Sequence, residues 1–471
     1  MSRVLLACFV VISIGGMKSA GGDWTHYGGG LDRNAIGSPG PWLLSPAAWI
    51  CPPAMDESLI SGGSPIAAGD SAYYLVPVVD GNLHVADRVV AVRATDGMRR
   101  WATDIEPAAF DSWSSPAFDV RNQLVLVGSG FTLYALNAAD GSIVFQTPLF
   151  HPVANASPLV TMNLFKYGKP ANRAFMSDFD FGDATLYAIN VDPFDSDANP
   201  YQLGEIVWTA NLGSAGGSTP SYANGKVVIA DADGDVTAYG ARSGDLRWCT
   251  SFSWAQFFGG LSICDDHAYV ASYNFGFGAN NSALIKLDLE DGGVDWITAC
   301  ERTDSIPIVT KDRKIYLSCG YDSDGSAVRV QAYRDNGATA NRLWDTYVGT
   351  GGALRVGGWQ DQPVIVGNFL LIGAPAPAGP LAPFTDLFAL DLTKTPGAAG
   401  FVKTWTTGAG GSVAVTDWRA FSIGVDGLSC FRLYKSPSPI LLPTPDSAPA
   451  SAIIMDGATP RGVDHVKKSR E

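Results

Sequence analysis

A short pattern repeats along most of this sequence, and the repetition constrains the fold more than any other feature. In the clearest copy, residues 91–101, an alternating apolar segment is followed by an Asp-Gly turn and a second segment that ends in tryptophan. This arrangement is the signature of a β-hairpin. Seven copies can be aligned, and they end in Trp101, Phe145, Trp208, Trp248, Trp296, Trp344 and Trp405, with turn glycines that include Gly97, Gly141 and Gly244.

The sequence upstream of most copies predicts another pair of strands, so that each repeat contributes four antiparallel strands. Such a unit at a period of roughly 40–50 residues is typical of a β-propeller blade. After Trp405 the sequence predicts only three more strands, and we expect the fourth at 47–51, where Trp49 has the aromatic position. The predicted fold is all-β: an eight-bladed β-propeller of four-stranded antiparallel blades, closed by N- and C-terminal strands.

The two ends of the chain differ in composition from the propeller, which is expected at 21–434. An apolar run at 4–17 followed by small residues predicts a secretory signal peptide at 1–20, with an interior strand or an uncleaved anchor as the alternative. No later run is long and apolar enough to predict a membrane span. Residues 435–471, rich in proline and serine, predict a disordered tail. We therefore expect an exported protein that is periplasmic or extracellular.

Charge and cysteine content restrict the possible functions. The chain has 32 basic and 46 acidic residues and a formal charge of −14, which argues against a surface for nucleic acid or an anionic membrane. The cysteine spacing matches no zinc or haem motif, so no metal site is predicted. Cys51 and Cys430 both fall in the predicted closing blade, and we predict a disulfide between them. Buried free thiols are the alternative for the cysteines of this chain.

The repeat resembles that of a known family. Its alanine, glycine and tryptophan positions are similar to the tryptophan-docking motif of pyrroloquinoline-quinone-type (PQQ-like) β-propellers, and residues 23–28 resemble the mature N-terminus of that family. The family includes quinone-dependent dehydrogenases and non-catalytic exported scaffolds similar to the outer-membrane assembly factor. The resemblance implies the architecture much more strongly than an activity, because the tryptophan and glycine are packing and turn residues.

One face of the predicted propeller is the candidate binding surface. The loops between second and third strands and the loops between blades emerge on the same face, and several are long. We predict that Trp113, Trp254 and Trp359 converge there, with Phe257 and Arg355 beside them, and stack on a partner's side chains, a sugar or a flat cofactor. The alternative is that these aromatic residues pack within their own loops.

An acidic insertion belongs to the same predicted face. Asp178, Asp180 and Asp183 fall within six residues and could share a cation or present a negative patch, with a solvated loop as the alternative. Three other acidic strings, which begin at Asp195, Asp231 and Asp322, depart from the EF-hand pattern and are interpreted as turns.

The sequence favours binding over catalysis. In the quinone alcohol dehydrogenases an adjacent-cysteine disulfide commonly covers the quinone, and this sequence has no adjacent cysteines. No residue matches the calcium or base positions of that class by motif, so no catalytic residue is assigned. We prefer a non-catalytic scaffold without a cofactor that binds an envelope or extracellular protein. The alternatives are a dehydrogenase of alcohols or sugars that uses PQQ and calcium, and a protein that binds a polysaccharide or surface polymer.

Overall fold

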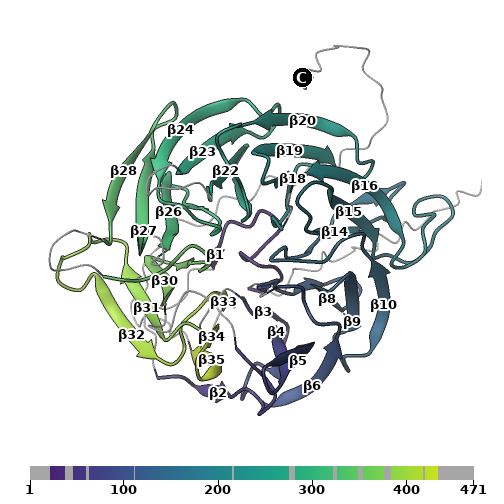
Figure 1. Cartoon of the computed structure of the whole chain (residues 1–471), viewed down its shortest axis with the longest axis horizontal. Coiled ribbons are helices and arrows are strands. Elements are labelled where there is room, and N and C mark those ends of the chain that lie inside the picture. The colour runs from purple at the N-terminus through teal and green to yellow at the C-terminus, as the bar shows by residue number, and fades with distance from the viewer. Residues whose placement is uncertain are drawn as a thin grey trace, which may run out of the picture.

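The computed structural model describes residues 22–37, 46–59, 63–110, 112–214, 217–274, 282–321, 326–347, 354–375, 383–416 and 419–432. All regular elements within these ranges are β-strands, and they form a ring of small sheets around a central axis (Figure 1). Seven sheets have four strands and one has five. The predicted eight-bladed propeller is therefore confirmed. The predicted signal peptide and tail lie outside the described residues.

Blades 1 to 4 follow one another along the chain and around the ring, and in each the first strand is innermost (Figure 1). Blade 1 contains β3 (Ile66–Ala68), β4 (Ser71–Asp80), β5 (Leu83–Arg93) and β6 (Arg99–Ile105). Blade 2 contains β7 (Ala117–Asp119), β8 (Leu124–Ser129), β9 (Thr132–Asn137) and β10 (Ile143–Pro148). Blade 3 contains β11 (Leu159–Val160), β14 (Arg173–Ser177), β15 (Ala184–Asn190) and β16 (Ile206–Gly213), with a small extra hairpin of β12 (Phe165–Lys166) and β13 (Lys169–Pro170). Blade 4 contains β17 (Ser221–Ala223), β18 (Lys226–Ala230), β19 (Asp235–Gly240) and β20 (Leu246–Ser251).

Blades 5 to 8 complete the ring. Blade 5 contains β21 (Leu261–Cys264), β22 (His267–Ala271), β23 (Ser282–Asp288) and β24 (Val294–Cys300). Blade 6 contains β25 (Ile308–Val309), β26 (Lys314–Tyr321), β27 (Ser326–Asp335) and β28 (Ala340–Asp345). Blade 7 contains β29 (Val364–Val366), β30 (Phe369–Ala374), β31 (Asp386–Asp391) and β32 (Val402–Thr407), with β1 (Ile36–Gly37) parallel to β29. Blade 8 contains β33 (Val413–Val415), β34 (Arg419–Gly424), β35 (Gly427–Arg432) and β2 (Trp49–Cys51).

The repeated aromatic residue of one blade docks on the repeated glycine of the next. The Trp101 indole of blade 1 covers Gly141 in the last turn of blade 2, and its Nε1 donates to the Ala138 carbonyl at 3.0 Å. Gly141 has φ +75°, and a Cβ added to it would lie 2.5 Å from the Trp101 ring, so only glycine fits. The same contact occurs in the pairs Trp49–Gly97, Phe145–Gly204, Trp208–Gly244 and Trp248–Gly292.

The docking changes towards the end of the ring. Trp296 donates to the Asp335 carboxylate at 3.1 Å, and Trp344 packs edge-on against Phe401 with ring centroids 5.7 Å apart. Trp405 stacks on Phe388 and is 61% exposed. It is exposed because the third and fourth strands of blade 8, β35 and β2, come from opposite ends of the chain and share no hairpin turn on which an indole can dock.

Strand β2 closes the ring as the sequence predicts, but the predicted disulfide is wrong. β2 pairs antiparallel with β35, with Trp49 opposite Cys430 and Cys51 opposite Leu428. The two cysteines are diagonal neighbours, and such residues lie about 7–8 Å apart, beyond the usual Cα separation of about 4.4–6.8 Å for a bridge. Both are buried free thiols. The other cysteines in the described part of the chain are also free, but not all of them are buried.

Residues 22–37, here called the axial segment, run through the centre of the ring before the first blade begins. Most of the axial segment is not part of a blade, so its buried backbone N–H and C=O groups need hydrogen-bond partners from the surrounding blades. Hydrogen bonds join the axial segment to the first strand of each of blades 1 to 7 in turn, pairing Trp24 with Ala67, Thr25 with Phe118, His26 with Val160, Leu31 with Tyr222, Asp32 with Ile263, Asn34 with Val309, and Ala35 with Ile365.

Arg33 anchors the axial segment. Its guanidinium group is fully buried and donates to four backbone carbonyl groups at 2.8–3.1 Å. One acceptor, Tyr27, belongs to the axial segment, and the others, Ser157, Pro158 and Pro220, precede or begin the first strands of blades 3 and 4. A planar donor group with five N–H bonds suits such a fan of acceptors better than an ammonium group.

Candidate binding face

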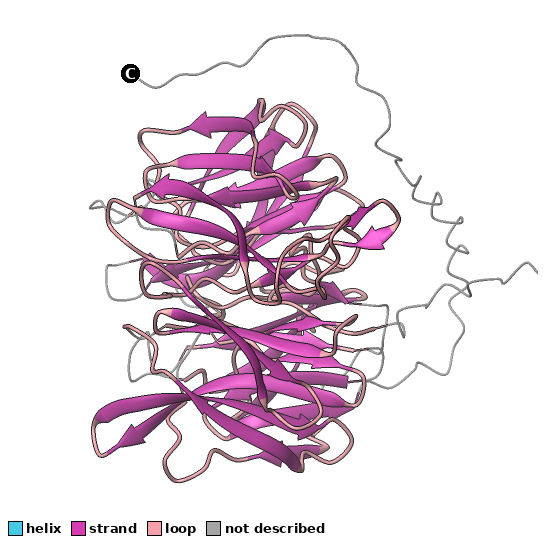
Figure 2. Cartoon of the chain, turned by 90° about the vertical axis from the view of Figure 1, so that its right-hand side faces the viewer, coloured by secondary structure: helices cyan, strands magenta, loops and turns pink. Residues whose placement is uncertain are grey.

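The two ends of the propeller carry different connections. The loops between second and third strands and the loops between blades lie at one end, here called the loop face. The turns between first and second strands and between third and fourth strands lie at the other, here called the turn face. Figure 2 shows the ring from the side, with connections at both ends. This division follows from antiparallel pairing within each blade, and it places all the residues predicted to bind on the loop face.

Four aromatic rings meet near the axis on the loop face and form the central aromatic cluster, defined as Trp113, Tyr273, Tyr321 and Trp359. The Trp359 ring is the hub, with its centroid 5.2 Å from Trp113, 5.1 Å from Tyr273 and 5.4 Å from Tyr321. Trp113 comes from the loop between blades 1 and 2 and Trp359 from the loop between blades 6 and 7. The predicted convergence of these two tryptophans is confirmed, and both are half-buried.

The two tyrosines of the cluster were not among the predicted binding residues. Tyr273 follows β22 and Tyr321 ends β26, so each stands where a second strand enters its loop. The guanidinium of Arg302 lies over the Tyr273 ring at 5.5 Å from the centroid, a cation–π contact. The available signal was a tyrosine at the end of the second strand in two consecutive repeats, four residues after Tyr269 and five after Tyr316.

Two of the predicted contact residues lie elsewhere. Trp254 is exposed, but its ring packs edge-on against Phe252 at 5.9 Å and not against the central aromatic cluster. Phe257 is buried in the core between blades 4 and 5, so its predicted role in binding is wrong. Its backbone N–H donates to Asp231 at 3.0 Å, which turns the ring inwards. Arg355 is exposed on the loop face, and its binding role stays a prediction.

Two buried carboxyl groups lie beneath the cluster. The backbone N–H of Asp304 donates to the Trp359 carbonyl at 2.8 Å, and burial raises the pKa of the Asp304 carboxyl well above its usual range. Asp361 accepts a hydrogen bond from the backbone N–H of Gly373 at 2.8 Å, and burial raises its pKa to about 7. Both groups also raise the pKa of Tyr27 in the axial segment, after burial itself. The centre of the loop face therefore has neutral acid groups below an aromatic surface at acidic pH.

The acidic insertion between β14 and β15 does not bring its carboxylates together. Asp178 is buried and accepts from the Thr185 N–H at 2.7 Å and the Tyr187 hydroxyl at 2.6 Å, and burial raises its pKa. Asp180 accepts from two backbone N–H groups of its own turn, and Asp183 accepts from Asn211. Asp178 is thus a structural residue. Within the described ranges no group of three or more His, Cys, Asp or Glu residues is placed to hold a metal ion.

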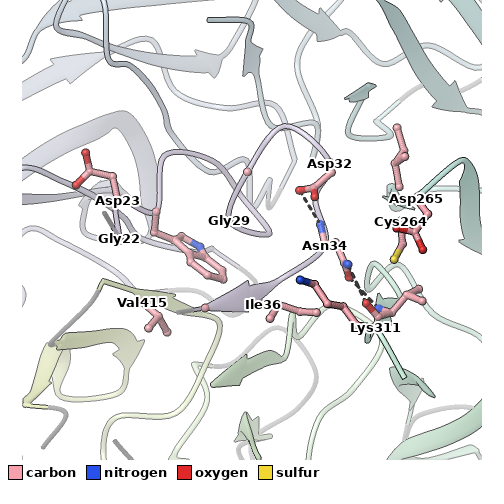
Figure 3. Close-up of a pocket in the computed structure, with 15 residues that line it drawn as sticks. Gly22, Asp23, Gly29, Asp32, Asn34, Ile36, Cys264, Asp265, Lys311 and Val415 are labelled. Carbon is pink, nitrogen blue, oxygen red and sulfur yellow. Dashed lines mark hydrogen bonds between the residues drawn. The ribbon is translucent and has the colours of Figure 1, made fainter. Parts of the chain in front are cut away.

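A pocket of about 480 Å³ opens on the turn face, between the axial segment and the first turns of blades 5, 6 and 8 (Figure 3). Asp32, Asp265 and Lys311 contribute charged side chains to its wall. The Asn34 side chain is already committed, because it both donates to and accepts from the backbone of Val309. This pocket could not be predicted from the sequence, because it depends on where the axial segment lies in the ring.

Comparison with known proteins identifies a family for this chain and solved structures with the same fold. Residues 85–192 and 197–375 match the family described as outer membrane protein assembly factor BamB. The outer membrane protein assembly factor BamB of Yersinia pestis is 28% identical over 260 residues, which cover 48% of this chain and 57% of that protein. The match thus spans less than two thirds of the curated relative.

Two solved structures share the fold. BamB from Moraxella catarrhalis superposes with a TM-score of 0.57 and 15% identity, covering 84% of this chain and 100% of that one. The quinohemoprotein alcohol dehydrogenase of Comamonas testosteroni gives a TM-score of 0.60 and 12% identity, covering 88% of this chain and 81% of that one. At these identities the likeness concerns the fold alone. None of the segments that the structure describes is a helix long and apolar enough to cross a membrane.

Proposed function

The chain belongs to the family of the outer membrane protein assembly factor BamB, and from this premise we propose that it is an exported, non-catalytic scaffold whose loop face binds another protein of the cell envelope. The central aromatic cluster is the observation that carries the proposal. Trp113 and Trp359 come from loops on well-separated blades, yet their rings are in contact and remain partly exposed. Aromatic anchors at the centre of a surface are typical of protein interfaces.

The geometry beneath the cluster favours binding over catalysis. A quinone-dependent dehydrogenase needs a carboxylate base that reaches the substrate. Asp304 and Asp361 are the acidic groups under the cluster, and both are buried with raised pKa values. Residues that could line a quinone are therefore accompanied by carboxyl groups that are covered by protein and do not reach a substrate on the loop face. We propose that the protein has no resident cofactor.

Replacement of the two tryptophans tests the proposed surface. A photo-reactive amino acid at the exposed position of Arg355 should crosslink to a defined envelope protein in cells that express the intact chain. The double variant Trp113→Ala/Trp359→Ala should reduce this crosslink at least about tenfold, the size expected when two aromatic anchors are lost. Trp113→Phe/Trp359→Phe should restore most of it, because a smaller ring keeps the stacking surface.

Trp405→Ala is the matched control, since Trp405 is an exposed tryptophan in the outer strand of blade 7. The crosslink should be unaffected by that substitution. Unchanged crosslinking in the Trp113/Trp359 double alanine variant, with folding verified by circular dichroism, would reject the cluster as the contact surface. Incubation with PQQ and calcium separates the enzymatic alternative: a bound chromophore and dye reduction with alcohols or sugars would contradict a non-catalytic scaffold. Specific retention on a glycan array would favour polymer binding instead.

A further inference from the structure

A second group of aromatic rings, four phenylalanines, stands on the loop face of blades 1 to 3. Phe110 in the loop between blades 1 and 2 is 66% exposed, Phe150 in the loop between blades 2 and 3 is 63% exposed, and Phe181 at the tip of the β14–β15 hairpin is 78% exposed. Phe179 joins them, with its centroid 5.6 Å from Phe110 and 5.2 Å from Phe181. These four residues are called the phenylalanine ridge. Apolar rings that gather on a surface mark an interaction site more often than single ones do.

Buried hydrogen bonds hold the ridge in place. Tyr187 accepts from the backbone N–H of Phe150 at 2.7 Å and donates to Asp178 at 2.6 Å, while the Phe150 ring packs on the Tyr187 ring. The backbone N–H of Phe179 donates to Pro152 at 2.8 Å, which ties the hairpin of blade 3 to the preceding loop. The rings are therefore presented by an ordered support whose central group is a buried carboxyl.

The backbone at Phe110 also keeps its ring in the open. Phe110 has φ +59°, in the left-handed region that a bulky residue rarely adopts. A bulky residue in that conformation is strained, so the surrounding structure has to hold it there. Folding alone gives no reason to hold a phenylalanine in this conformation with most of its ring in water.

The surroundings of the ridge are acidic. Asp180 and Asp183 belong to the same hairpin as Phe181, Glu106 and Asp104 lie at the end of blade 1 before Phe110, and Asp80 ends β4. In the described loop-face segments of blades 1 to 3, the single lysine or arginine is Arg88. Arg88 is already engaged, because it pairs with Asp104 at 2.6 Å and with Asp56 at 3.0 Å. Asp104 is therefore neutralised by Arg88, whereas Asp80, Glu106, Asp180 and Asp183 have no lysine or arginine partner among the described residues.

We propose that the phenylalanine ridge docks a basic amphipathic segment of the partner protein, with apolar side chains on the four rings and lysine or arginine side chains against the flanking carboxylates. The inference rests on the proposed protein-binding function and assigns to it a second surface and a partner chemistry. Electrostatic complementarity gives such a contact its orientation and its association rate. The same acidic flank repels anionic membranes, so we favour a protein segment over a lipid surface.

Two synthetic helical peptides with the same leucine and phenylalanine face test the proposal, one with lysine and the other with glutamate on the polar face. Fluorescence anisotropy with the full chain should give an affinity for the lysine peptide at least about tenfold higher than for the glutamate peptide. Phe110→Ser/Phe181→Ser should weaken the lysine peptide at least about tenfold, and added salt should weaken it further.

Matched variants separate charge from folding effects. Asp180→Asn keeps an acceptor for the turn N–H groups while removing the charge, and together with Asp183→Asn it should lower the affinity for the lysine peptide only. Tyr167→Ser is the control, because Tyr167 is 80% exposed on the turn face. It should leave binding unchanged.

Three outcomes would overturn the inference: equal binding of both peptides, binding that survives Phe110→Ser/Phe181→Ser in a folded protein, or ridge-dependent binding to phosphatidylcholine vesicles in place of peptide. Failure of this inference can be distinguished from failure of the proposed function. If the crosslink at position 355 requires the two tryptophans but neither peptide depends on the ridge, the ridge is rejected and the scaffold stands. If peptide binding requires the ridge but the crosslink survives loss of the tryptophans, the cluster is rejected instead.

Discussion

Asp361 lies where the axis of the ring meets the loop face, and its surroundings favour the protonated carboxyl. The side chain is fully buried and accepts from Gly373, and burial raises its pKa to about 7. In the unfolded chain the same group ionises near its ordinary value, so the folded state binds the proton more tightly. The stability that Asp361 contributes is therefore complete below the ordinary carboxyl pKa and is lost as the pH rises towards about 7.

This linkage predicts that Asp361→Asn flattens the dependence of stability on pH. Between about pH 4 and pH 7 the free energy of unfolding of the native chain should fall more steeply than that of the variant, because asparagine stays neutral throughout. Urea unfolding across that range measures the difference. Asp183→Asn, on the exposed rim, serves as the control and should leave the slope of the native chain unchanged. Parallel curves for Asp361→Asn and the native chain would contradict the assignment.

Individual residues show which parts of the site could be predicted from the sequence and which could not. The order of strands places each loop on a face, which is why Trp113 and Trp359 could be predicted to meet. The order of strands does not tell how deep a side chain lies within its loop. Phe257 lies in a loop whose backbone bonds to Asp231 in the β18–β19 turn of blade 4, and Phe110 has a positive φ; neither feature can be predicted from composition.

At the scale of elements, neighbouring blades are joined by an aromatic residue that fits over a glycine turn. The contact can be read in the sequence because both partners recur at fixed spacing, and the eight-bladed fold followed from them. The exceptions to this docking pattern could not be predicted from the sequence. Trp405 is exposed because its neighbouring blade is assembled from two ends of the chain. The register of β2 against β35 likewise separates Cys51 from Cys430, and register depends on contacts that spacing alone does not specify.

The docking contact predicts a difference between two glycine substitutions with the same backbone cost. Gly141 and Gly168 have φ values of +75° and +74°, but a Cβ at Gly141 would meet Trp101 while nothing lies within 4 Å of one at Gly168. Gly168→Ala should destabilise by about 1–2 kcal/mol, the cost of the left-handed backbone. Gly141→Ala should cost about 2 kcal/mol more, because the indole is displaced from a buried contact.

The midpoints of urea unfolding compare the two variants under the same conditions. Equal shifts would mean that the indole moves aside freely and that docking adds little to blade cohesion. A shift confined to Gly141→Ala, with the Gly168→Ala protein close to the native chain, would place nearly the whole effect in the contact between blades.

At the scale of the whole molecule, the axial segment connects blades that are distant from one another in the chain. Its residues resemble the start of a known family, but the sequence did not reveal that they bond to seven first strands in succession. Such bonds depend on a ring that exists only after folding. Arg33 is the clearest example, because its acceptors come from the axial segment and from blades 3 and 4.

Loss of the Arg33 hydrogen bonds should lower the stability of the whole propeller. Arg33→Met keeps much of the buried volume but leaves four carbonyl groups without their donor, and an unsatisfied buried polar group costs about 1–3 kcal/mol. We expect a decrease in unfolding free energy of at least about 3 kcal/mol, measured by urea unfolding and accompanied by faster proteolysis of several blades together. Arg247→Met, at an exposed arginine in the outer strand of blade 4, is the control. Cleavage limited to the axial segment would show that the blades hold together without it.

The joining of β2 to β35 has a consequence for how the protein is made. A ribosome delivers Trp49 long before Cys430, and these residues face each other only in the finished ring. Contacts so remote in the chain are slow to form, and an incomplete circle offers open strand edges to other molecules. The last blade to be synthesised therefore decides when the nascent chain stops being vulnerable to aggregation.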